Sequence, residues 1–176
     1  MKKYVLSVIF ILIALMELQA QDYKWWAGGR MTLWTNKDDS KVVVAPDVGY
    51  HLSNKFTIAA SVGFHSYSFD DNSMSPDKSG FVLNPYIRYN AFRKGIISGY
   101  VDGGAEFGIS DMKGFNIGLK PGSAIHLTER FCVALHFGFI GYRDGKSDGI
   151  GINRSMKGFG IDLSGYQSGF GFFYSF

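Results

Sequence analysis

The sequence predicts an all-β protein, an eight-stranded antiparallel up-and-down transmembrane β-barrel. Three observations lead to this fold class. Apolar and polar residues alternate in eight stretches, with no helical periodicity between them. Short and long connections alternate between the stretches, as in a series of hairpins. One face of every stretch is apolar and uncharged, whereas the other face holds the ionisable residues.

The first 20 residues are interpreted as a cleaved signal peptide. Met1, Lys2 and Lys3 form a basic start, the run 5–16 is apolar but too short to span a membrane comfortably, and Ala20 ends a plausible cleavage site. Residues 21–176 then form one exported domain. The residue directly after the cleavage site is Gln21 and not a cysteine, so a lipoprotein is not expected.

Composition excludes two other classes of protein. Loss of the first 20 residues lowers the formal net charge from +3 to +2, and no basic stripe suggests nucleic-acid binding. Cys132 is the only cysteine, so no internal disulfide framework holds the fold. The 23 glycines and the 16% aromatic residues favour β-structure.

The eight predicted strands are defined by their alternation. They cover Lys24–Trp34, Val42–Leu52, Phe56–Ser66, Phe81–Asn90, Ile97–Ile109, Phe115–Leu127, Phe131–Tyr142 and Gly158–Phe176. Connections 53–55, 91–95 and 128–130 are tight. Connections 36–40, 67–80 and 143–156 are polar and mostly longer, and only 110–114 is short at that end.

Two irregularities interrupt this pattern. Pro46, Pro85 and Pro121 lie in the middle of predicted strands, and because proline donates no ladder hydrogen bond, bulges or wide pairs are expected there. In the last stretch the apolar positions are odd at 159–163 but even at 170–176. A bulge near 164–168 would reconcile the two parities.

The apolar face fits a lipid-facing exterior better than the interior of a soluble barrel. An eight-stranded barrel encloses little space, and phenylalanine in most strands would overfill it. Aromatic residues also gather at both strand ends, as in the two girdles of a membrane barrel. They are Phe64, Phe81, Phe107, Phe115 and Phe139 near the long connections, and Trp25, Tyr50, Phe56, Tyr89 and Phe131 near the tight turns.

The polar face then lines the lumen, where charges must be paired because burial of a lone charge is costly. Three basic and three acidic residues on that face are balanced, and we expect them to form an ion-pair network that plugs the barrel. They are Arg30, Arg88 and Lys120, with Asp47, Asp102 and Glu106.

The chain resembles small bacterial outer-membrane β-barrel proteins, which are OmpX-like or OmpA-domain-like. The resemblance is carried by the signal peptide, the eight strands, the hairpin GYHLSNKFTIAASVGF and the alternating aromatic end SGFGFFYSF. It implies that Phe170, Phe172, Tyr174 and Phe176 form the signal read by the barrel-assembly machinery. It also implies an integral outer-membrane location, with both termini periplasmic and with lipid and lipopolysaccharide as surroundings.

Candidate catalytic and metal-binding residues are few. His51, His65, His126 and His136 lie on four different strands without metal-ligand spacing, so we expect lumenal packing and neither a metal nor another cofactor. A lipid A-modifying enzyme would need a Ser–His–acid set near the long connections, where His65 and Ser66 precede Asp70 and Asp71. The spacing does not establish that geometry, and no residue is assigned a catalytic role.

The sequence therefore favours a monomeric, non-enzymatic outer-membrane barrel with a polar, plugged lumen. Its role would be structural, or interaction with a surface partner through the connections 67–80 and 143–156. A lipid A acyl hydrolase or acyltransferase and a soluble periplasmic lipocalin-like carrier are the alternatives.

Overall fold

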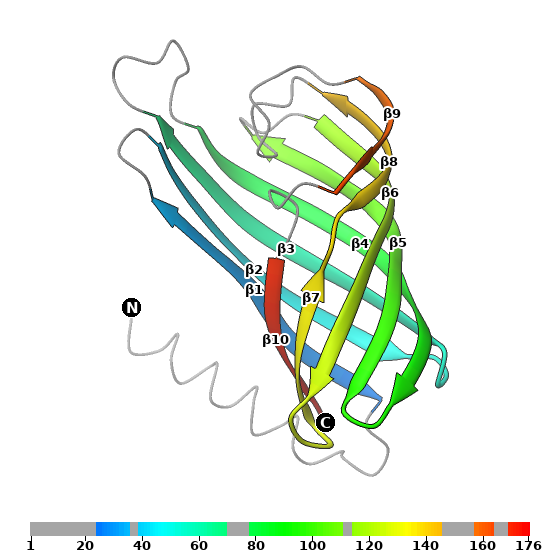
Figure 1. Ribbon diagram of the computed structural model, residues 1–176. Coiled ribbons are helices and arrows are strands. Elements are labelled where there is room, and N and C mark those ends of the chain that lie inside the picture. The colour runs from blue at the N-terminus through cyan, green and yellow to red at the C-terminus, as the bar shows by residue number, and fades with distance from the viewer. Residues whose placement is uncertain (1–23, 36–38, 70–77, 111–113, 146–156, 164–168) are drawn as a thin grey trace.

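The computed structural model describes residues 24–35, 39–69, 78–110, 114–145, 157–163 and 169–176, and all their regular elements are strands (Figure 1). The strands are β1 (Trp25–Thr35), β2 (Asp39–His51), β3 (Phe56–Phe69), β4 (Lys78–Lys94), β5 (Ile97–Ser110), β6 (Gly114–His126), β7 (Phe131–His136), β8 (Phe139–Gly145), β9 (Gly158–Asp162) and β10 (Gly169–Ser175). In the part of the chain that is described, no helix is both long and apolar enough to cross a membrane.

The strands form one closed antiparallel barrel of eight strands, which confirms the predicted all-β, up-and-down barrel architecture. β1 to β6 pair in chain order, β6 pairs with β7, β7 with β10, and β10 with β1, so the ring closes. β8 and β9 extend the barrel wall beside β6. The seventh predicted stretch is therefore β7 followed by β8, and the eighth is β9 followed by β10.

The two chain ends of the barrel domain meet at the end that carries the tight turns (Figure 1). The backbone N–H of Phe176 donates to the carbonyl of Trp25 at 2.9 Å, and the N–H of Ser175 donates to the carbonyl of Arg130 at 2.8 Å. At the opposite end, β3 and β4 reach Phe69 and Lys78, so the predicted connection 67–80 is partly strand. The end with the tight turns is the turn end, and the opposite end is the loop end.

Side-chain alternation decides which residues face outward. Ile58, Val62 and Leu83 keep 44, 49 and 38% of their surface exposed, although they are large and apolar. Their polar neighbours Thr57 and Ser61 are almost fully buried. Most large apolar side chains thus lie on the outside of the barrel and the ion-paired side chains lie in its interior, as period-two alternation in a closed sheet allows.

The strand prolines are accommodated in two ways. Opposite Pro46 and Pro85 the ladder lacks two pairs but keeps its register, since Val44 pairs with Phe64 and Asp47 with Ser61 on the same count. No bulge occurs at these two prolines, and the ladder is interrupted as the alternative of wide pairs expects. Interruption without a shift suffices because the missing N–H removes only local hydrogen bonds.

A bulge does occur opposite Pro121. Between the pairs Gly122–His136 and Leu119–Ile140, β6 advances three residues whereas the neighbouring strand advances four. The carbonyl of Pro121 accepts the N–H of Phe137 at 2.9 Å, and Gly138 adopts a φ of 152°. The extra residue reverses the facing of every later side chain in that strand.

This reversal corrects two sequence expectations. Phe139 was expected in the outer aromatic girdle, yet it is 3% exposed and points into the lumen. Arg143, expected in a connection, lies in β8 and is also buried inside. Tyr142 instead takes the outward place, where its ring lies 6.0 Å from that of Phe115.

The eighth stretch changes its facing between β9 and β10. From Asp162 to Gly169 the chain advances seven residues, whereas their partners Phe139 and His136 are three apart. The two ladders thus differ by four residues. The predicted bulge at 164–168 lies outside the described residues.

Candidate functional site in the barrel interior

The interior of the barrel is organised around one buried ion pair. Arg88 on β4 and Asp102 on β5 lie directly opposite each other in the sheet, and alternation turns both side chains inward. The Nε of Arg88 donates to Oδ1 of Asp102 at 2.7 Å, and its Nη2 donates to Oδ2 at 2.8 Å. Such a two-pronged, charge-assisted pair is the geometry that best offsets the desolvation of both groups.

Aromatic rings enclose the guanidinium of Arg88 on the remaining sides. Its Cζ lies 3.9 Å from the ring centre of Tyr100 and within 6 Å of three further rings. These are the rings of Trp26, Tyr86 and Phe173. The electron-rich faces attract the cation and exclude water from it.

A second group of residues contacts the same carboxylate from β7, which is separated from β5 by the single strand β6. The Nε2 of His136 lies 2.9 Å from Oδ2 of Asp102, and its ring stands edge-on to Tyr100. The hydroxyl of Tyr100 donates to the backbone carbonyl of Leu135 at 3.1 Å. Strands β4, β5 and β7 are thus joined through the lumen as well as through the wall.

Asp47 on β2 forms the next ion pair. The hydroxyl of Tyr86 donates to its two carboxylate oxygens at 3.1 and 3.0 Å, and Nη2 of Arg30 lies 3.8 Å from Oδ2. The same nitrogen of Arg30 donates to Oγ of Ser61 at 2.9 Å. Asp47 is only 2% exposed, so these contacts replace its hydration.

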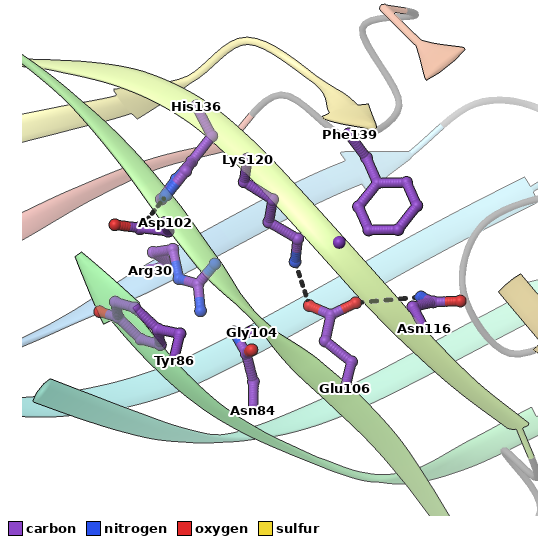
Figure 2. A pocket seen from close by; sticks show the side chains of 11 residues that line it. Arg30, Asn84, Tyr86, Asp102, Gly104, Glu106, Asn116, Lys120, His136 and Phe139 are labelled. Carbon is purple, nitrogen blue, oxygen red and sulfur yellow. Dashed lines mark hydrogen bonds and ion pairs between the residues drawn. The ribbon is translucent and has the colours of Figure 1, made fainter. Parts of the chain in front are cut away.

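Glu106 and Lys120 form a third pair nearer the loop end, on neighbouring strands β5 and β6. Lys120 Nζ donates to Oε1 of Glu106, and Nδ2 of Asn116 donates to Oε2 at 3.1 Å, as Figure 2 shows. Together with Arg30, Asp102 and His136, these groups border a small cavity. Its free volume is about 10 Å³, which is room for about one water molecule.

A fourth ion pair, which the sequence did not reveal, lies above this cavity. Nη1 of Arg143 on β8 donates to Oδ2 of Asp162 on β9 at 3.1 Å, and the guanidinium lies 4.6 Å from the ring centre of Phe139. Arg143 was missed because the one-residue shift opposite Pro121 is not visible in the hydrophobic pattern. The inward facing of Trp26 and Phe173 could have been predicted from the sequence, since each lies between two outward-facing aromatic or small residues.

The described lumen is therefore electrically balanced, with four basic and four acidic side chains in ion pairs. All six residues predicted for the network lie inside the barrel. They meet as three pairs, Arg30 with Asp47, Arg88 with Asp102, and Lys120 with Glu106. These pairs join neighbouring strands to one another through the interior of the barrel.

The histidines near the turn end contact hydroxyl groups on adjacent strands. Nδ1 of His51 lies 2.7 Å from Oγ1 of Thr57, and Nε2 of His126 lies 2.9 Å from Oγ of Ser98. The hydroxyl of Ser53 accepts the N–H of Phe56, and so caps the turn. Among the described residues, no group of three or more His, Cys, Asp or Glu side chains could hold a metal ion.

The outer surface carries paired aromatic rings at both ends of the strands. At the turn end Trp25 meets Tyr50 at 4.9 Å, and Phe56 meets Tyr89 at 5.3 Å between ring centres. At the loop end Phe64 lies 5.5 Å from Phe81. The rings of Phe170, Phe172 and Tyr174 on β10 are 39–50% exposed and continue this outer face.

One exposed ion pair lies at the loop end, where Asp144 is on the same face of β8 as Tyr142. Nζ of Lys157 is 3.1 Å from Oδ2 of Asp144. The hydrogen bond and the charge of that carboxylate raise the pKa of Lys157 above its ordinary value. The lysine is already protonated at neutral pH, so the shift does not alter its charge there.

Comparison of the chain with protein-family models, with curated proteins and with solved structures found no match. Its function must therefore be argued from its own residues.

Proposed function

We propose that this protein is an integral bacterial outer-membrane β-barrel with a structural or surface-interaction role. The single observation that carries the proposal is the outward display of apolar side chains around a charged interior. Thirty large hydrophobic residues of the described chain are substantially exposed, and the ion pairs are buried. A barrel in water is expected to have its charged side chains outside and its apolar side chains inside. Apolar side chains outside and charges inside are favoured when the barrel is surrounded by hydrocarbon.

The dimensions of the barrel support the same proposal. A membrane-crossing strand needs about 9–11 residues when it is tilted, and strands β1 to β6 each contain 11 to 17 residues. Where the ring is closed, each strand is hydrogen-bonded to two neighbours, which is the arrangement that allows strands to cross lipid. The aromatic pairs at both strand ends suit the two interfaces of a bilayer.

The small size of the cavity among the described lumen residues argues against a soluble carrier. Pockets for small molecules usually enclose about 300–1,000 Å³, whereas the cavity beside Glu106 has a free volume of about 10 Å³. An acyl or other bulky ligand would have to displace the ion pairs. The proposed barrel is accordingly non-conducting, and we assign it no catalytic residue and no cofactor.

The orientation follows from the chain ends and the connections. We place the turn end and both termini in the periplasm, and the connections 67–80 and 143–156 at the cell surface, where they would meet a partner. The exterior contacts lipid, and lipopolysaccharide surrounds the loop end. The outward aromatic series Phe170, Phe172, Tyr174 and Phe176 would be the signal for the barrel-assembly machinery.

Cell fractionation tests the membrane assignment. The protein is expected in the detergent-extracted outer membrane, where the folded barrel migrates differently on a gel before and after boiling. Release with the periplasmic contents, without such a shift, would refute the assignment.

A planar bilayer tests the plugged lumen separately. Purified protein is expected to give no large stable conductance steps, because the ion pairs fill the interior. Analysis of lipid A mass from expressing cells addresses the enzyme alternative, since acyl transfer or hydrolysis would change that mass.

A further inference from the structure

The two ends of the barrel differ in charge. Among the described residues, the turn end has five basic side chains and one acidic side chain, Glu129. The basic residues are Lys24, Lys55, Arg93, Lys94 and Arg130. At the opposite end, the described residues apart from the lumen ion pairs include three basic ones, Lys41, Lys78 and Lys157, and two acidic ones, Asp39 and Asp144. The excess of positive charge among the described residues is therefore concentrated at the turn end.

The strand register places these cations around one rim. Lys24 precedes β1, Lys55 lies in the turn between β2 and β3, and Arg130 lies in the turn between β6 and β7. Arg93 and Lys94 end β4 beside Gly95, whose φ of 61° forms the tight hairpin. The side chains of all but Arg130 are exposed.

The rim is continuous with the outer apolar surface. Leu52, Phe92, Ile96 and Leu127 are 58–63% exposed in or beside the same tight turns. The guanidinium Nη1 of Arg130 donates to the hydroxyl of Tyr174 at 3.3 Å, at the edge of the outer aromatic face. Basic and apolar groups thus alternate at the level where a bilayer passes from hydrocarbon to headgroups.

Headgroup chemistry matches this combination. A phosphodiester carries one negative charge and several acceptor oxygens, which lysine and arginine bind by charge-assisted hydrogen bonds. Long basic side chains also keep their stems along apolar surface while the charged ends reach the interface. Attraction to an anionic leaflet adds to binding for each basic residue near the surface.

We propose that the turn end is a binding surface for anionic phospholipid headgroups, formed by Lys55, Arg93 and Lys94 with the flanking Lys24 and Arg130. The inference rests on the proposed membrane location and adds the class of lipid that the periplasmic rim selects. The inference applies to the turn end and not to the loop end, where the numbers of described basic and acidic residues are nearly equal.

Native mass spectrometry of the detergent-solubilised, folded protein measures the preference directly. Phosphatidylglycerol and phosphatidylcholine of equal acyl composition are added in equal amounts, and retained lipid is counted. The wild-type protein is expected to retain phosphatidylglycerol on the order of tenfold more than phosphatidylcholine. The variant K55Q/R93Q/K94Q is expected to retain the two lipids nearly equally.

Two further variants make the result specific. K55R/R93K/K94R keeps the charges and is expected to keep the preference. K41Q/K78Q/K157Q removes three lysines from the loop end and is also expected to keep it.

Equal retention of both lipids by the wild type would overturn the proposal, as would an equal loss of preference in the loop-end variant. Membrane extraction and the gel shift of each variant are recorded in parallel. A protein that fails these two readouts contradicts the membrane assignment, whereas a folded, membrane-extracted barrel without lipid preference contradicts only the rim.

Discussion

Arg88 and Asp102 face each other across adjacent strands and share two hydrogen bonds, of 2.7 and 2.8 Å, at the centre of a ring of aromatic side chains. Both side chains are nearly inaccessible to water. Each therefore depends on the other for compensation of its charge, because the surrounding rings offer no carboxylate or hydration shell.

Replacement of Arg88 by methionine is expected to lower the free energy of unfolding by about 3–5 kcal/mol, because Asp102 keeps a buried charge with fewer partners. Urea titration of the refolded barrel, followed by tryptophan fluorescence, measures the change. The double variant R88M/D102L is expected to recover part of the loss. K157M breaks an exposed ion pair and should leave the unfolding midpoint unchanged; a similar drop in K157M and R88M would contradict the central role of the buried pair.

A charge placed on the outer face tests the orientation of the barrel in lipid. Val62 lies midway along β3 and is 49% exposed. V62K is expected to destabilise the inserted barrel by about 2–4 kcal/mol, because the ammonium must enter hydrocarbon. The fraction of heat-modifiable protein in vesicles reports the effect. L52K, at the turn end, serves as the control and should fold nearly as well as the wild type; equal folding of both variants would argue against a lipid-facing exterior.

Two aromatic residues near the C-terminus are expected to have different roles, Phe173 in the stability of the folded barrel and Phe176 in its assembly in the cell. Phe173 is buried against Trp26, with ring centres 5.0 Å apart. F173A is expected to cost about 3–5 kcal/mol of stability in refolded protein. F176S is expected to reduce insertion in cells while leaving refolding in detergent close to normal, since its role would be recognition. Outer-membrane yield and detergent refolding are compared for both variants, and normal cellular yield of F176S would remove it from the assembly signal.

The pair of Glu106 and Lys120 provides a test of the plug. Truncation of both residues in E106A/K120A leaves no lone charge and enlarges the cavity beside Arg30 and Phe139. Small, stable conductance steps are expected in a planar bilayer, where the wild type gives none. I117A changes the outer face of the same strand and should stay silent. Absence of conductance in the double variant would mean that other groups close the lumen.

The sequence was sufficient for the fold because one physical signal repeats in every strand. Alternation identified all eight stretches and the correct inward facing of Asp47, Arg88 and Glu106, since a one-residue error in register would have exposed them. Tight turns at one end and longer connections at the other fixed the order of the hairpins. These patterns are local in the sequence, so they can be interpreted without knowledge of tertiary contacts.

The rest depended on how neighbouring strands accommodate one another. Pro46, Pro85 and Pro121 look alike in sequence, yet only Pro121 faces a bulge. The difference lies in the partner strand, which supplies an extra residue at Gly138. For the same reason the pattern assigned Phe139 to the wrong face and overlooked Arg143.

The extra residue at Gly138 sets the inward or outward facing of every side chain in β8. Deletion of Gly138 alone would shift the register of β8 by one residue. Phe139 and Arg143 would then face outward, and Ile140 and Tyr142 would face the barrel axis. The single residue Gly138 thus sets which side chains of β8 face inward and which face outward, although it contributes no side chain of its own.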